Sequence, residues 1–165
     1  MISSSNERNV LYKVFSTGSN QEVDAKLKEL VDAFDQGGAE IREEVANEVA
    51  NVFEHFCLSP WSSSRALAVL RGAGRVIGHE RLAFGIERAA CNGNEEIMRE
   101  ALALIAPPER AAALRAAVGS ARNAPSRGFA ALVEQWAQAL EDQSALESLP
   151  AIAKEGASER SKPRL

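Results

Sequence analysis

Alanine is the residue that most constrains what this chain can fold into. Of its 165 residues 29 are alanine, whereas only nine are Phe, Trp or Tyr. Alanine has the highest helix propensity of all residues, and strands are instead enriched in β-branched and aromatic side chains. The sequence therefore predicts an all-α protein, a compact bundle of about six to eight short helices.

Capping residues, glycines and prolines mark where these helices begin and end. Ser19 and Glu22 form a capping box, and apolar residues at helical spacing follow it until Gly37 and Gly38. Ser59 and Pro60 are expected to cap and open another helix. Together these signals predict helices over residues 19–36, 39–58, 59–77, 79–90, 94–106, 108–122 and 126–140, the last with Phe129, Leu132, Val133, Trp136 and Leu140 along its inward face.

Two stretches depart from this regular pattern. Gly72 and Gly74 should break or kink the helix over 59–77, because each glycine costs about 1 kcal/mol relative to alanine in a helix interior. Residues 10–15 fit a helix turn or a short strand equally well, since the run is too short for its period to decide.

The length of the chain is that of one domain. We expect a single helical domain over residues 1–153, in which residues 1–18 have no clear structural signal, followed by a disordered charged tail over 154–165. Residues 66–70 are similar to residues 101–105 at an offset of 35. A solenoid-like stack of helix pairs is therefore the minor alternative to the bundle.

Residue patterns of common enzymes and metal proteins do not occur in the sequence. The pairs His55 with Cys57 and His79 with Cys91 fit no common zinc spacing. Ala83 stands where an HExxH motif that begins at His79 needs its second histidine. A GxSxG nucleophile elbow and a Walker lysine are also missing. We therefore assign no catalytic residue, no metal site and no cofactor, and we expect a non-enzymatic protein.

Charge is distributed unevenly along the chain. Residues 1–58 carry 5 basic and 11 acidic side chains, residues 59–130 carry 10 and 6, and all ten basic residues of that middle segment are arginine. The net charge of −4 therefore conceals an acidic first third and an arginine-rich middle. Such asymmetry indicates a charged interaction surface.

The acidic third contains carboxylates at helical spacing around the Gly37-Gly38 turn. Like charges at i and i+4 cost a few tenths of a kcal/mol, and a carboxylate surface attracts a basic partner and speeds its encounter. A solvated face that keeps the protein soluble is the alternative. We predict that another protein with a basic surface binds this acidic ridge, as in an adaptor, a chaperone or a toxin-neutralising inhibitor; the ridge consists of Asp32, Asp35, Glu40, Glu43, Glu44 and Glu48.

The arginines of the middle segment form a second candidate surface. Guanidinium groups bind phosphate through two parallel hydrogen bonds, so clustered arginines would suit a regulator that binds nucleic acid or a phosphorylated ligand. Pairing of these arginines with glutamates inside the fold is the alternative, and the acidic pI near 5.3 favours it. The candidate residues are Arg65, Arg71, Arg75, Arg81 and Arg88.

The remaining expectations concern location and assembly. The chain has no run of about 18 apolar residues, and Met1–Val10 lacks the basic and then apolar plan of a secretory signal. We expect a cytoplasmic protein with two reduced cysteines and no membrane contact. An alanine-rich face over residues 111–117 can pack helices within one chain or between two, so the protein is expected to be a monomer or a homodimer.

Overall fold

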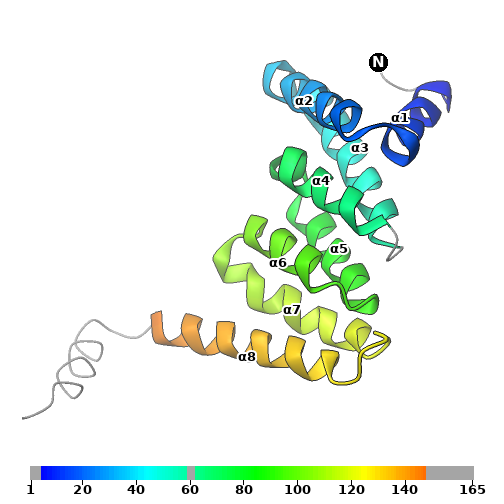
Figure 1. Ribbon diagram of the computed structural model, residues 1–165. Helices are drawn as coiled ribbons and strands as arrows, with labels where there is room; N and C mark the ends of the chain where they lie inside the picture. The colour runs from blue at the N-terminus through cyan, green and yellow to red at the C-terminus, as the bar shows by residue number, and fades with distance from the viewer. Residues whose placement is uncertain (1–4, 59–61, 148–165) are drawn as a thin grey trace, which may run out of the picture.

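The all-α fold class is confirmed by a computed structural model, which describes residues 5–58 and 62–147, with side chains from residue 11 onward. These residues form eight α-helices and no strand (Figure 1). The helices are α1 (Ser5–Thr17), α2 (Asn20–Gln36), α3 (Ala39–Cys57), α4 (Ser63–Ala73), α5 (His79–Cys91), α6 (Glu95–Leu104), α7 (Pro107–Ala121) and α8 (Phe129–Glu147), with a short 3-10 turn, η2 (Gly74–Val76), before α5.

Local signals fixed several of these boundaries as predicted. The Ser19 hydroxyl accepts a hydrogen bond from the Glu22 N–H at 3.2 Å, and the Ser19 N–H donates to the Glu22 carboxylate at 2.6 Å, which completes the capping box of α2. The Asn94 side chain caps α6 by accepting from the Ile97 N–H at 3.1 Å. The helix expected over 59–77 breaks where its glycines stand, since α4 ends at Ala73 and η2 follows.

Three further predictions concern residues 10–15, the cap at Ser59 and Pro60, and the C-terminal tail. Residues 10–15, which allowed a helix or a strand, belong to helix α1. The expected cap at Ser59 and Pro60 and the tail over 154–165 lie outside the described residues.

The helices follow one another as a stack of pairs (Figure 1). Helix α2 packs on α3 and α4, α3 packs on α4 and α5, α4 packs on α6, and α5 packs on α6 and α7. These contacts place α2, α4 and α6 in one layer and α3, α5 and α7 in the other. The predicted bundle of helices is thus arranged as stacked pairs, but the 35-residue offset is not its repeat, because α4 and α6 begin 32 residues apart.

Alanine lies at the contacts between these helices. A methyl side chain lets two backbones approach closely, so a chain with few aromatic residues still fills its interior. Phe15 and Phe53 supply bulk at the N-terminal end and are fully buried. The alanines that are themselves fully buried are Ala66, Ala89, Ala90, Ala101, Ala117 and Ala137.

Candidate functional site

The acidic ridge lies on α2 and on the first half of α3. Glu40 and Glu43 are exposed and Glu44 is half-buried. Within residues 5–58 and 62–147, no side chain makes a hydrogen bond or an ion pair with these three carboxylates. We call Glu40, Glu43 and Glu44 the unpaired ridge. The exposed side chain of Ile41 lies beside them on α3, with 44% of its surface accessible.

The other members of the acidic ridge have different surroundings. Asp32 is bound by Lys28 at 3.0 Å on the same helix, and Asp35 by Arg75 at 2.6 Å. Glu48 is half-buried on α3. The structure therefore brings the six predicted residues to one helix pair, but two of the carboxylates already have a cationic partner in the chain.

Arg42 is the one arginine of α3, which has no lysine, and it is directed away from the unpaired ridge. Its Nε donates to the Phe34 carbonyl at 3.1 Å and its Nη2 donates to the Asp35 carbonyl at 3.4 Å. These carbonyls belong to the last turn of α2, where a cation is favoured by the helix dipole. Arg42 therefore caps α2 and gives the unpaired ridge no counter-charge from its own helix.

Three of the candidate arginines bind carboxylates within the chain. Arg71 donates to Glu100 at 2.9 Å and to Glu96 at 3.1 Å, while Arg75 binds Asp35. These hydrogen bonds raise the pKa of both arginines. Their guanidinium groups are thus engaged by carboxylates rather than presented together.

Arg81 is the third candidate arginine that binds a carboxylate, whereas Arg65 and Arg88 make contacts of other kinds. Arg81 donates to the carboxylate of Glu54 and to the Asn51 side chain, the latter at 2.6 Å, and its hydrogen bond to Glu54 raises the pKa of Arg81. Arg65 donates to the Gly18 carbonyl at 2.5 Å. Arg88 lies over the ring of Phe84, with its guanidinium carbon 4.7 Å from the ring centroid.

Most of these ion pairs join neighbouring helices of one layer, a pattern that sequence analysis did not identify. Arginine suits such contacts because its planar fork binds a carboxylate from a long, adaptable side chain. Glu54 pairs with Arg81 between α3 and α5, and Arg71 pairs with Glu96 and Glu100 between α4 and α6. His79 contacts Glu109 at 2.8 Å between α5 and α7.

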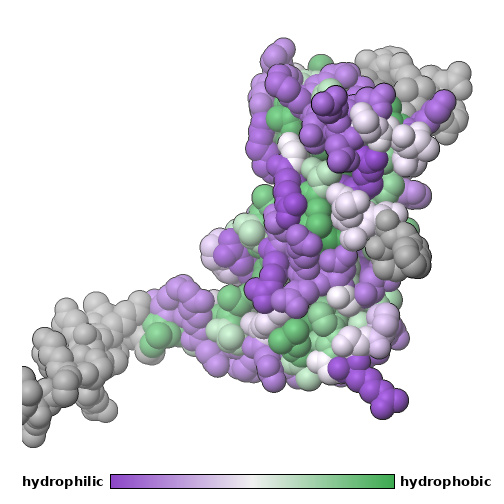
Figure 2. Space-filling model, viewed as in Figure 1, coloured by the Kyte–Doolittle hydropathy of each residue, from purple (hydrophilic) through white to green (hydrophobic). Residues whose placement is uncertain are grey.

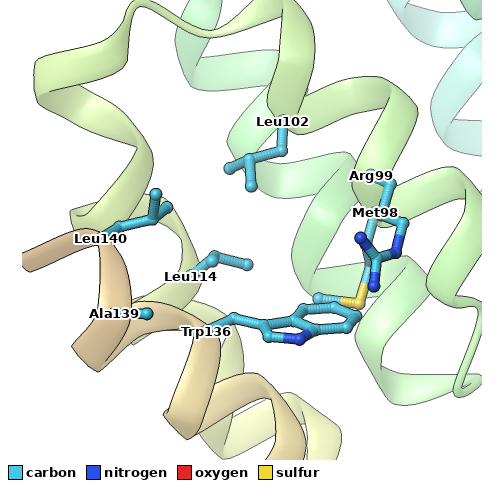
Figure 3. Close-up of a pocket in the computed structure, with 7 residues that line it drawn as sticks. All are labelled: Met98, Arg99, Leu102, Leu114, Trp136, Ala139 and Leu140. Carbon is cyan, nitrogen blue, oxygen red and sulfur yellow. The ribbon is translucent and has the colours of Figure 1, made fainter. Parts of the chain in front are cut away.

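An apolar groove between α6, α7 and α8 was also missed by sequence analysis (Figure 3). It has a volume of about 210 Å³ and is lined by Met98, Arg99 and Leu102 of α6, Leu114 of α7, and Trp136, Ala139 and Leu140 of α8. The Arg99 guanidinium carbon lies 4.5 Å from the Trp136 ring centroid, which is a cation–π contact. Figure 2 shows apolar side chains at the surface where α8 meets the stack, whereas the α2 end is mostly hydrophilic.

The cysteine and histidine of the α3 C-terminus have structural surroundings. Cys57 is buried, and burial, with a smaller contribution from the charge of Glu54, raises its pKa from 9.0 to about 12. A thiol with so high a pKa is protonated at neutral pH and is a poor nucleophile. His55 packs edge-on against Tyr12 and Phe56, with ring centroids 5.3 and 5.1 Å apart.

Comparisons of the chain with protein-family models, curated proteins and solved structures found no match. Within the described residues, none of the helices has the length and hydropathy that a bilayer crossing requires.

Proposed function

We propose that this protein is a non-enzymatic helical module that binds another protein, of the adaptor, chaperone or toxin-neutralising inhibitor kind. Its acidic ridge receives a basic surface of that partner. One observation carries the proposal: the unpaired ridge has three adjacent carboxylates without a counter-charge in the described chain. The five candidate arginines of the middle segment, by contrast, are engaged within the fold.

The spacing of the unpaired ridge supports this role. Glu40 and Glu43 are one helical turn apart, as are Glu40 and Glu44, and like charges at these spacings destabilise a helix by a few tenths of a kcal/mol per pair. A cationic partner removes this repulsion on binding. The same carboxylates accelerate encounter with a basic surface, most strongly at low ionic strength.

The apolar side chain of Ile41 adds contact area beside the charges. Protein interfaces combine an apolar centre with a polar rim, and scattered charges alone give rate and specificity more than affinity. An exposed isoleucine among three glutamates is therefore consistent with a small docking patch on α3. A partner that presents lysine or arginine around an apolar side chain fits it best.

Charge reversal tests this proposal. All three residues of the unpaired ridge are changed to lysine, and proteins captured from a lysate of the native host are identified by mass spectrometry. We expect the ridge variant to lose a basic protein that the wild type retains. The matched control reverses three exposed carboxylates elsewhere, at Asp24, Glu80 and Asp142, and should retain that protein.

Circular dichroism must show equal helicity for both variants, so that lost capture reports on the surface and not on folding. The affinity of the identified partner should also fall as salt rises from 50 to 200 mM, because the contact is between exposed charges. An unchanged set of captured proteins in the ridge variant would contradict the proposal. Retention on heparin with a steep salt dependence would instead support the arginine surface.

A further inference from the structure

Helix α8 departs from the stacking that the other helices follow. It packs closely along α7, but it does not pack on α6 in the way that α6 packs on α4. Its C-terminal end extends beyond the stack (Figure 1). Leu146, near that end, has 57% of its surface accessible. The groove between α6 and α8 is open because of this divergence.

The size and lining of the groove favour a side chain from a helix over a small molecule. Ligand pockets usually have volumes of roughly 300–1,000 Å³, whereas this groove has about 210 Å³. Its walls are aliphatic apart from Trp136, Met98 and the stacked guanidinium of Arg99 (Figure 3). Trp, Met and Arg are enriched where proteins bury side chains against each other.

A heptad-like seam runs along the groove side of α8 and continues past the stack. Its residues are spaced alternately by four and three positions, the pattern by which helices pair in coiled coils. The polar side chain of Gln143 donates to Glu147 of the same helix at 3.1 Å. The α8 seam consists of Leu132, Trp136, Ala139, Gln143 and Leu146.

This seam is complementary to itself in an antiparallel arrangement. If a two-fold axis passes beside residue 141, Trp136 faces Leu146 of the second copy and Ala139 faces Gln143 of the second copy. The large ring of Trp136 thus contacts the exposed side chain of Leu146, and the methyl group of Ala139 contacts the longer polar side chain of Gln143. Glu141 does not oppose its own copy across the axis, because it is directed to α7 and bound by Arg115 at 2.8 Å.

The charges beside the seam are also complementary in this arrangement. Glu147 lies eleven residues, or close to three full turns, after Trp136 and therefore shares its face of α8. Antiparallel pairing brings Glu147 of the second copy to the end of the groove where Arg99 is held over Trp136 and also binds Glu95 of its own helix at 2.8 Å. We propose that the α6–α8 groove binds the C-terminal end of α8 from a second copy of this chain, and that the exchange is reciprocal.

Analytical ultracentrifugation of the full chain over a range of concentrations tests the proposal. We expect a monomer–dimer equilibrium that Leu146→Lys shifts to monomer, with a dissociation constant raised at least about tenfold, because a charge then enters an apolar groove. Leu58 is as exposed as Leu146, at 53%, and lies outside the groove, so Leu58→Lys is the matched control and should dimerise normally. A wild type that is monomeric at every concentration would overturn the proposal.

A charge exchange identifies the second copy as the occupant. Arg99→Glu and Glu147→Arg should each weaken self-association, because each places like charges together twice in the symmetric dimer. An equal mixture of the two variants should dimerise again, since in the mixed dimer every substituted side chain faces its opposite charge. Failure of the mixture to recover, with both variants folded by circular dichroism, would refute the Arg99–Glu147 contact and the register built on it.

Discussion

Gly85 lies in the interior of α5, where alanine is normally preferred, and yet Gly85→Ala should destabilise the protein. A Cβ at this position would overlap the ring of Phe53 from α3. Phe53 is fully buried, so its ring has no free space into which it can move. Glycine is therefore required here by the close approach of α3 and α5.

The magnitude follows from two opposing contributions. Alanine stabilises a helix interior by about 1 kcal/mol relative to glycine. Forcing an extra methyl group into a packed core costs about 1–3 kcal/mol, and the overlap with an immobile ring places the cost in the upper half of that range. The net expectation for Gly85→Ala is a loss of about 1–2 kcal/mol in the free energy of unfolding.

Gly119 of α7 provides the matched control. An added Cβ there meets no atom within 4 Å, so Gly119→Ala should stabilise the protein by about 0.5–1 kcal/mol. Urea unfolding followed by circular dichroism measures both free energies. In the double variant with Phe53→Leu, the cost of Gly85→Ala should shrink, because the smaller side chain leaves room. If Gly85→Ala were as stabilising as Gly119→Ala, the packing of α3 on α5 described above would be wrong.

Two further predictions concern a buried thiol and a helix cap. Burial raises the pKa of Cys57 from its ordinary value of 9.0 to about 12 in the fold. Its contribution to stability is therefore complete below pH 9 and declines as the pH rises toward 12, by about 1.4 kcal/mol at pH 10. Cys57→Ala should therefore flatten the dependence of unfolding free energy on pH between 9 and 11, and an unchanged slope would contradict the burial of the thiol. Ser19→Ala removes the cap of α2 and should cost about 1 kcal/mol; calorimetry should show a lower Tm, and an equal Tm would mean that the capping box contributes nothing.

Features that depend on neighbouring residues in the chain were predictable from the sequence. The Ser19 capping box, the Asn94 cap and the break at Gly74 are each determined within one or two helical turns. Residues 10–15 could not be assigned in this way. The side chain of Phe15 is fully buried, and its ring lies 6.4 Å from that of Phe56 on α3. Phe15 and Phe56 are more than 40 residues apart in the sequence, so a local sequence pattern cannot predict their contact.

The groove was missed for a related reason. Periodicity placed Trp136 and Leu140 on an inward face of the last helix, and a stripe of that kind normally indicates a covered core. Whether such a stripe is covered depends on the direction that the helix takes against its neighbours. Since α8 follows α7 and diverges from α6, part of an ordinary inward face lines an open groove.

The same packing explains why some acidic residues have arginine partners and the unpaired ridge has none. The contact of Phe53 with Gly85 sets the register of α3 against α5 in their shared layer. Glu40 lies thirteen residues before Phe53, whereas α5 begins only six residues before Gly85. At a rise of about 1.5 Å per residue, the start of α3 extends roughly 10 Å beyond the start of α5. Glu54 lies within the shared length and meets Arg81. The unpaired ridge lies on the overhang, where the next helix of its layer offers no arginine, and within the described residues its charge therefore has no cationic partner.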